Sequence, residues 1–348
     1  MTTNITDTSL GTLSEPGRTH SSASAVIEVQ ELRHQYENRT ALDGVSFAVR
    51  HAEIFGLLGP NGSGKTTLFR ILSTLMLPTA GRATIMGHDV ASDPTGVRRE
   101  IGVVFQAQSI DVKLTARENL THVGHLYGLK GAELKKRVDE MLGRVGLSDR
   151  ANENAETFSG GMQRRLELAK GLLHHPSVLL LDEPTTGLDP GARRDLWQYL
   201  QLLRDQEQVT VIVTTHLMEE AERCDRLAIL SHGQLMALGT PTELKQEIGG
   251  DVVVLETRDA ESLAQRIKAR FGVETAVVGE TVRIEREAGH RFVTEVVESF
   301  PGEIDSLSVS KPTLEDVFIH RTGHRFWTEE EQNNATIAEK SGKKKKKH

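Results

Sequence analysis

Residues 59–67 restrict the fold of this chain more than any other part of the sequence. They read Gly-Pro-Asn-Gly-Ser-Gly-Lys-Thr-Thr and fit the phosphate-loop pattern G-x-x-x-x-G-K-[ST]. Glycines in this pattern let backbone N–H groups turn inward around a polyphosphate. The residues expected to bind nucleotide here are Gly59, Pro60, Asn61, Gly62, Ser63, Gly64, Lys65, Thr66 and Thr67.

The context of the loop supports this interpretation. The apolar run 53–58 before it is suited to a buried strand, and residues 67–72 after it have helical apolar spacing. A helix that begins at the loop directs its dipole at the phosphates, Lys65 supplies a charge to the β- and γ-phosphates, and the Thr66 hydroxyl can ligate Mg²⁺. A glycine-rich turn with a chance lysine does not require this order. The segment therefore predicts a nucleoside-triphosphate site.

Composition limits the classes of protein to consider. The chain has 348 residues, enough for two or three domains, and its 37% hydrophobic and 26% charged content is typical of a soluble globular protein. No apolar run approaches the length of a membrane-spanning helix. Cys224 is the only cysteine, expected to pack within a polar helix, and it favours a cytosolic setting. The net charge of −7 is unfavourable for nucleic acid as a partner, and we expect none.

Three further strands are predicted to deliver polar side chains at their carboxyl ends. Gln106 follows the strand 101–105, and an amide there can ligate a metal or hold a water, although a loop glutamine is the commoner role. The buried strand in 178–184 ends in Asp182 and Glu183, of which the first can hold the water shell of magnesium and the second can orient or deprotonate a water. The strand 209–215 delivers His216 to the same sheet edge as Glu183.

Two other positions are open to more than one interpretation. Ser159 is a good helix N-cap, and Gly160 and Gly161 after it leave helical N–H groups open to an anion, but a helix start without a ligand has the same pattern. Tyr36 ends the first predicted strand. It can be a core or rim aromatic, or it can stack on a base.

Taken together, these motifs resemble the nucleotide-binding subunit of an ATP-binding-cassette (ABC) transporter over roughly residues 26–239. The signature at 158–162 separates this family from other phosphate-loop proteins. Met162 stands where many members carry glutamine, while the positions that touch phosphate are intact. The matching residues, in the family's order, are Tyr36, the loop 59–67, Gln106, the signature Ser159, Gly160, Gly161 and Met162, the pair Asp182 and Glu183, then Asp189 at the dimer seam, and His216.

The resemblance implies an α/β fold of the P-loop NTPase class. It implies an ATPase domain over residues 25–245, with a mixed sheet core, an antiparallel β subdomain and a helical subdomain at about 107–158. Lys65, Glu183 and His216 would be catalytic. Mg²⁺ would be held by Thr66, by Gln106 and, through water, by Asp182. ATP would bind between two copies of the chain paired head to tail, with the signature contributed in trans.

Three segments resemble the branch that serves type-2 ABC exporters, including daunorubicin-resistance ATPases. They are residues 159–169 with 215–222, and Lys-Pro-Thr-Leu-Glu-Asp-Val-Phe at 311–318. This resemblance implies peripheral association with a permease of about six spans at the cytoplasmic face of the plasma membrane, and export of a drug, lipid or polysaccharide. The alternative is a non-transport ABC ATPase acting on ribosomes or DNA. One cassette and no long heptad insertion argue against that alternative.

Residues 250–322 are expected to form a separate small domain. Their predicted order, βαββαβ, indicates an α+β ferredoxin-like fold. Such a domain can be a regulatory or dimer-steadying appendage, or a small docking module whose role is packing. We expect residues 1–24 and 328–348 to be disordered tails. The lysines at 343–347 are either a solvated tail or a contact for anionic lipid.

Overall fold

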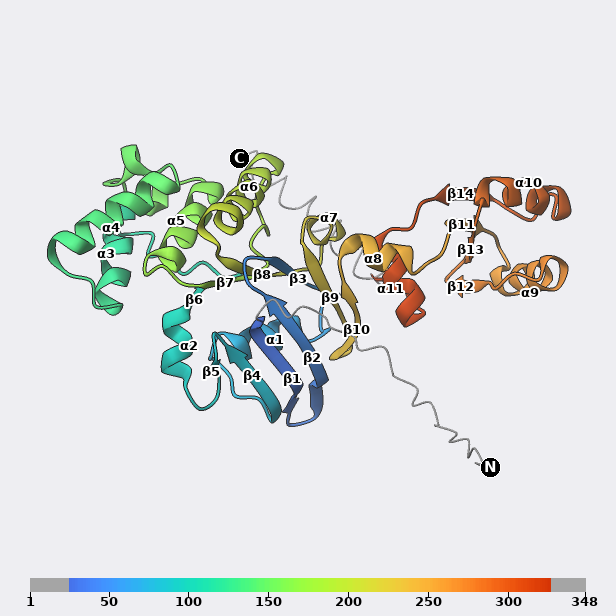
Figure 1. The fold of residues 1–348 in the computed structure, drawn as a ribbon. Helices are drawn as coiled ribbons and strands as arrows, with labels where there is room; N and C mark the ends of the chain where they lie inside the picture. Colours follow the sequence, from blue (N-terminus) through green and yellow to red (C-terminus); the bar gives the residue numbers. More distant parts are fainter. Residues whose placement is uncertain (1–24, 327–348) are drawn as a thin grey trace, which may run out of the picture.

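The computed structural model describes residues 25–326, so both expected tails lie outside the described residues. A mixed sheet of six strands forms the centre of the larger part of the molecule (Figure 1). Its strands, in spatial order, are β10 (Gln234–Gly239), β9 (Arg226–Ser231), β3 (Ile54–Leu58), β8 (Thr210–Thr215), β7 (Val178–Asp182) and β6 (Ile101–Val104).

Largely apolar sequence explains why the central strands of this sheet are buried. Every residue of β3, β7 and β8 is buried, as is usual for strands covered on both faces. Strands β9, β3, β8, β7 and β6 pair in parallel, while β10 runs antiparallel to β9 at the far edge. The carboxyl ends of the five parallel strands therefore meet at one edge of the sheet.

An antiparallel sheet covers one side of this core (Figure 1). Helix α1 (Lys65–Leu72) contributes Leu68 and Phe69 to the same apolar cluster as Phe55 of β3 and Ile27 of the antiparallel sheet. Helix α2 (Pro94–Glu100) begins after Asp93, whose side chain accepts a hydrogen bond from Gly96 N. The strands of the second sheet, in spatial order, are β2 (Arg39–Arg50), β1 (Ala25–Tyr36), β4 (Ala80–Ile85) and β5 (His88–Asp89).

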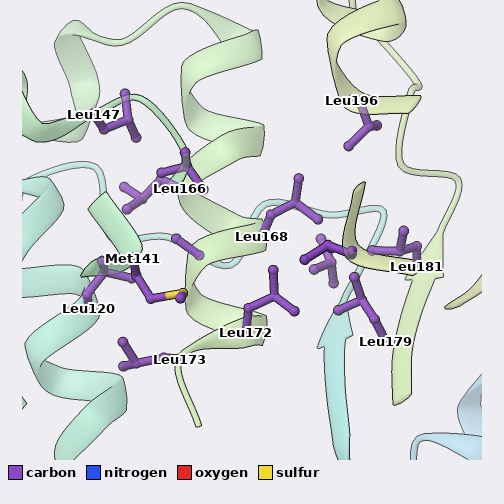
Figure 2. Packing of buried hydrophobic residues seen from close by; sticks show 14 of the residues in the cluster. Leu120, Met141, Leu147, Leu166, Leu168, Leu172, Leu173, Leu179, Leu181 and Leu196 are labelled. Atoms are coloured by element: carbon purple, nitrogen blue, oxygen red, sulfur yellow. The ribbon is translucent and has the colours of Figure 1, made fainter. Parts of the chain in front are cut away.

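The opposite side of the core carries helices α3 (Ala116–Leu126), α4 (Gly131–Arg144) and α5 (Gly160–Leu172). A capping box between Thr115 and Glu118 starts α3. Figure 2 shows that α5 joins two packing surfaces, because Leu166 lies toward the other helices while Leu168 and Leu172 lie toward strand β7. The helix that begins with Gly160 is thereby fixed to the sheet.

Helix α6 (Pro190–Glu207) starts at Pro190, which suits a first helical position because the N–H group that proline lacks would have no helical partner there. The prediction that Cys224 lies in a helix is wrong, because the short helix α7 (Met218–Ala221) ends before it. The next residue, Asp225, pairs with Ile54 of β3 through its backbone and its side chain, which draws the chain out of the helix and into β9. Cys224 is buried, in the same apolar cluster as Leu179.

A third sheet forms the separate C-terminal part of the molecule, at the right of Figure 1. Its order, β12-β13-β11-β14, is antiparallel throughout and has the predicted βαββαβ connectivity. The predicted α/β class with a small ferredoxin-like domain is therefore confirmed. The elements, in chain order, are β11 (Asp251–Glu256), α9 (Ala260–Phe271), β12 (Ala276–Val278), β13 (Thr281–Arg286), α10 (Gly289–Ser299) and β14 (Ser306–Ser310).

After β14 the chain returns to the larger part of the molecule. Helix α11 (Leu314–Thr322) begins with a capping box between Thr313 and Asp316 and lies beside α8 (Pro241–Gln246) (Figure 1). Its residues Leu314 and Phe318 share an apolar cluster with Leu58 at the end of β3.

Candidate nucleotide-binding site

The phosphate loop has a backbone that requires glycine. Gly62 and Gly64 have φ angles of 78° and 105°, in the left-handed region. A Cβ atom on Gly64 would lie 2.6 Å from the carbonyl oxygen of Ala41, so a larger residue is excluded by contact as well as by conformation. Helix α1 begins at the next residue, so its free N–H groups border the loop.

Lys65 lies almost entirely within this loop, with 5% of its surface exposed. Its Nζ atom donates hydrogen bonds to the carbonyl oxygens of Gly59, at 2.6 Å, and Pro60, at 3.0 Å. Burial lowers the pKa of the amine, while the nearby acids Glu183 and Asp182 act in the opposite direction. The Oγ atom of Ser63 is buried and has no hydrogen-bond partner within the described residues. The loop thus contains an enclosed cation and an unused hydroxyl group.

A cavity of about 340 Å³ opens over the loop. Residues from both sheets line it. Tyr36 and Arg39 come from the antiparallel sheet, and Gln106 and Glu183 follow strands of the six-stranded sheet. Tyr36 is 40% exposed, so it is a rim residue and not a core aromatic. Its hydroxyl lies 3.4 Å from Thr67 Oγ1. The remaining lining residues are Ala41, Asn61, Gly62, Gly64, Lys65, Thr66, Thr67 and Arg70.

Three side chains surround the carboxylate of Glu183. Its Oε1 atom lies 3.0 Å from His216 Nδ1, and its Oε2 atom accepts hydrogen bonds from Gln106 Nε2 at 3.1 Å and Thr186 Oγ1 at 3.4 Å. Burial acts to raise the pKa of Glu183, but the hydrogen bond and charge of His216, with the charge of Lys65, outweigh it and hold the pKa below its ordinary value. The structure therefore keeps Glu183 ionised and in contact with His216.

Glu183 also has a φ of 43°, which costs free energy in a residue other than glycine. Such strain is characteristic of functional positions. The neighbouring Asp182 is buried, which raises its pKa, and its Oδ1 atom accepts a hydrogen bond of 2.6 Å from Thr214 Oγ1. The same Thr214 hydroxyl accepts a hydrogen bond from Glu183 N at 3.0 Å. Strand β8 thus fixes both acids.

The signature residues lie elsewhere in the same chain. Ser159 caps α5 by accepting a hydrogen bond from Met162 N, and neither it nor Gly160, Gly161 or Met162 lines the cavity over the phosphate loop. Ser159, Gly161 and Met162 instead line a separate hollow of about 600 Å³, which Asp189 also lines. Asp189 caps α6, accepting hydrogen bonds from the N–H groups of residues 191 and 192.

Sequence reasoning missed a buried network behind the site. Arg164 of α5 donates hydrogen bonds to the carbonyl oxygens of Phe105 and Pro184, each at 2.8 Å, and to Glu167 Oε2 at 2.7 Å. Glu167 in turn accepts from Ser109 N at 2.7 Å. The network links the helix of the signature to the segments that carry Gln106 and Glu183. Opposite charges three residues apart in a largely apolar helix are the signal that could have revealed it.

Two arginines in the cavity were also missed. Arg39 donates a hydrogen bond of 2.8 Å to the carbonyl oxygen of Gly62, and Arg70 lines the cavity from α1. A basic residue just beyond the aromatic Tyr36 was the available signal for Arg39.

The oxygen ligands near the loop suit Mg²⁺ that is bound together with a nucleotide better than a metal ion held by protein side chains alone. Thr66, Gln106 and Asp182 offer oxygen ligands of the kind that Mg²⁺ prefers when it is bound mainly through phosphates. Within residues 25–326 no group of three or more histidine, cysteine or acidic side chains is placed to hold a metal ion. The residues present therefore fit a metal that arrives with a nucleotide.

A phosphate loop at the edge of a parallel sheet, with two acids and a histidine on adjacent strand ends, defines a nucleoside-triphosphate-binding α/β domain. Residues 42–186 match the family model for the ABC transporter. Residues 239–322 match the model for the C-terminal domain of ATP-binding proteins like DrrA1-3. With these matches, and with relatives 37–38% identical over 86% of the chain, this chain belongs to the ATP-binding, ATP-hydrolysing subunits of the ABC transporter family.

Curated relatives cover most of the chain. The daunorubicin resistance ATP-binding protein DrrA3 of Streptomyces coeruleorubidus is 38% identical over 312 residues, 86% of this chain and 97% of that protein. The linearmycin resistance ATP-binding protein LnrL of Bacillus subtilis (strain 168) is 37% identical, over 86% of this chain and 98% of its own. The Nod factor export ATP-binding protein I of Burkholderia thailandensis is 38% identical, over 87% and 98%.

Solved structures agree with this assignment. The chain resembles cbiO1 from Clostridium perfringens, part of an ABC transporter complex, with a TM-score of 0.60 and 25% identity over 71% of this chain and 96% of that one. It also resembles the dimeric post-hydrolysis state of MJ0796 bound to ADP and Pi, with a TM-score of 0.56 and 29% identity, over 62% and 98%. None of the helices between residues 25 and 326 is both long and apolar enough to cross a membrane.

Proposed function

We propose that two copies of this chain hydrolyse ATP at composite sites and thereby drive export through a separate membrane subunit. One observation carries the pairing. The signature residues Ser159 and Gly161 line a hollow separate from the cavity of the phosphate loop in their own chain. A second copy, paired head to tail, would bring its signature to that cavity.

ATP binding is assigned to the cavity over the phosphate loop. The glycines and the start of α1 supply N–H groups for the phosphates, and Lys65 exchanges its carbonyl partners for the β- and γ-phosphates. The residues Gly59, Pro60, Asn61, Gly62, Ser63, Gly64, Thr66 and Thr67 complete this contact. Tyr36 stacks on the base from the rim, which its 40% exposure and its place on the cavity wall support.

Glu183 is the residue assigned to water. It is ionised, it follows β7, and it lies beside His216, which follows β8, the strand between β7 and the β3 strand that precedes the phosphate loop. In this proposal it orients or deprotonates the attacking water, and His216 contacts the γ-phosphate. Lys65 neutralises negative charge that develops in the transition state.

Magnesium would be held by Thr66 and Gln106 directly and by Asp182 through water, and when bound it neutralises phosphate charge. Gln106 contacts Glu183 and follows β6, while α5 is tied to the segment before it through Arg164. Movement of Gln106 toward the metal would therefore be passed to the helices α3–α5, and from them to a membrane partner.

Dimer closure follows from a contact that only ATP offers. The start of α5 with Ser159, Gly160, Gly161 and Met162 would bind the γ-phosphate of the opposite copy, and Asp189 would lie at the seam. Because the γ-phosphate is lost on hydrolysis, the closed dimer is stabilised before the reaction and released after it.

Export is the direction we assign. The relatives named above are resistance and export proteins, and their likeness extends through the C-terminal domain. The partner in this proposal is a permease of about six spans, which would hold this chain at the cytoplasmic face of the plasma membrane. Drugs, lipids and polysaccharides are the substrate classes that such a permease would select.

Subunit complementation tests the composite site. Lys65→Ala and Ser159→Arg chains are each expected to be inactive as ATPases. A mixed dimer has one site in which both the phosphate loop and the opposing signature are intact, so mixing should restore activity. Wild-type chain mixed with each variant is the control for exchange of subunits. An inactive mixture, with exchange demonstrated, would refute pairing in trans.

Co-purification tests the transport assignment. A tagged chain from membranes solubilised in mild detergent should carry a stoichiometric polypeptide with about six predicted spans, identified by mass spectrometry. Recovery of ribosomal proteins or DNA without a membrane protein would refute export and favour a non-transport ATPase.

A further inference from the structure

We propose that Glu220 is a positioning residue for ATP hydrolysis, which holds the loop of Glu183 in register with the loop of His216. The inference rests on the proposed function of that pair. It assigns a role to a side chain of α7 that contacts neither the phosphate loop nor the cavity above it.

Two hydroxyl groups, one from the loop after β7 and one from the last residue of β8, bind the carboxylate of Glu220. Its Oε1 atom accepts a hydrogen bond from Thr185 Oγ1, and its Oε2 atom accepts one of 2.7 Å from Thr215 Oγ1. Thr185 lies two residues after Glu183, and Thr215 immediately precedes His216. Glu220 is therefore the meeting point of the two segments that carry the catalytic pair.

The burial of this carboxylate indicates more than a packing role. Glu220 and Thr185 are each 2% exposed, and Thr215 is 1% exposed. Among the described residues Glu220 has hydroxyl partners and no cation at ion-pair distance. A buried carboxylate without a cation costs free energy that an apolar side chain would not, so stability alone does not account for it.

The geometry explains what the carboxylate restrains. The Thr215 hydroxyl also accepts a hydrogen bond of 3.0 Å from Leu217 N. Both neighbours of His216 are therefore linked to Glu220, Thr215 directly and Leu217 through the Thr215 hydroxyl. On the other loop, Thr186 next to Thr185 donates to Glu183 Oε2. The anchored residues thus flank the 3.0 Å contact between Glu183 and His216. A displacement of about 1 Å at such a contact can lower a rate about 100-fold.

Steady-state ATP hydrolysis by Glu220→Ala and Glu220→Gln tests this inference. We expect Glu220→Ala to lower kcat by about 10- to 100-fold with KM within about twofold of wild type, because the phosphate loop is untouched. Glu220→Gln keeps one acceptor oxygen and should retain an intermediate kcat. Glu219→Gln and Glu222→Gln are matched controls at neighbouring, less buried positions, and they should behave as wild type.

A His216→Ala background identifies the route of the effect. If Glu220 acts through the Glu183–His216 contact, adding Glu220→Ala to His216→Ala should lower kcat by less than about twofold further. An equal additional loss in that background, or an unchanged kcat in the single variant, would overturn the inference.

Should Glu220→Ala fail to fold, Glu220→Gln and Thr185→Val decide the question. Thr185→Val keeps the shape of the side chain and removes its hydroxyl group. Lower kcat at constant KM in both folded variants supports the inference, and wild-type kcat in both refutes it. A wild-type chain that hydrolyses no ATP would instead refute the proposed function.

Discussion

His216 Nδ1 lies 3.0 Å from Glu183 Oε1, a contact between residues that follow adjacent parallel strands. The contact holds the pKa of Glu183 below its ordinary value in spite of burial. Because the pKa of Glu183 is lower in the folded state, its ionised form stabilises the fold at pH values above 4.5, the pKa of the unfolded state. This contribution to stability is lost as the pH falls through the folded-state pKa.

His216→Ala should therefore move the acid limb of the ATPase pH profile to higher pH. Burial of Glu183 remains in the variant, while the largest opposing influence on its pKa is removed. The measurement is kcat/KM against pH, normalised to each protein's maximum. His232→Ala, at an exposed histidine, is the control. An acid limb at the wild-type pH in His216→Ala would contradict the prediction.

Glu183→Gln should bind ATP and remain dimeric while hydrolysing it about 10²- to 10⁴-fold more slowly. The amide keeps the shape of the side chain but cannot accept a proton, and general-base catalysis contributes about that factor. ATP binding by calorimetry, dimer formation by size-exclusion chromatography with ATP, and single-turnover hydrolysis are the measurements. Glu219→Gln, at an exposed acid, should be unaffected. Rapid hydrolysis by Glu183→Gln would contradict its assignment.

Lys65→Ala should weaken ATP binding by about 10- to 100-fold, since hydrogen bonds to charged groups contribute about 1.5–3 kcal/mol. The binding constant can be measured with a fluorescent nucleotide, and circular dichroism checks the fold. Lys113→Ala removes an exposed ion pair with Glu156 and is expected to change nothing. Equal affinities of Lys65→Ala and wild type for ATP would contradict the assignment of Lys65 to the phosphate site.

Asp316→Ala should lower the free energy of unfolding of the C-terminal part by about 3 kcal/mol. Asp316 is 7% exposed, pairs with Arg283 of β13 and closes the capping box of α11 with Thr313. Urea unfolding is the measurement. Asp305→Ala removes an exposed ion pair with Arg258, whose atoms are 3.9 Å apart, and should change stability by less than about 0.5 kcal/mol. Similar losses in both variants would contradict the role given to the buried pair.

The arrangement of Gln106, Glu183 and His216 was predictable because local patterns determine it. Each residue follows an apolar strand, and parallel strands bring their carboxyl ends to one edge of a sheet. The caps at Thr115 and Ser159 were predictable for a similar reason, since capping depends on residues within one turn of the helix.

The supporting contacts were not predictable, because their partners are distant in the sequence. Arg164 binds the backbone at Phe105, and Glu220 binds Thr185. No sequence pattern has a fixed spacing that would reveal either pair. The break after α7 was missed because Asp225 competes with helix formation by pairing with Ile54, a tertiary contact that helical periodicity does not record.

The return of α11 to the larger part of the molecule changes what removal of the C-terminal domain would mean. Leu314 and Phe318 belong to the same apolar cluster as Leu58, the last residue of the strand that precedes the phosphate loop. A chain ending before β11 would lose the C-terminal domain and also the apolar side chains of α11 that pack next to the nucleotide site. Loss of ATPase activity in such a shortened chain would then report damaged packing, and only a truncation that preserves α11 could separate regulation from folding.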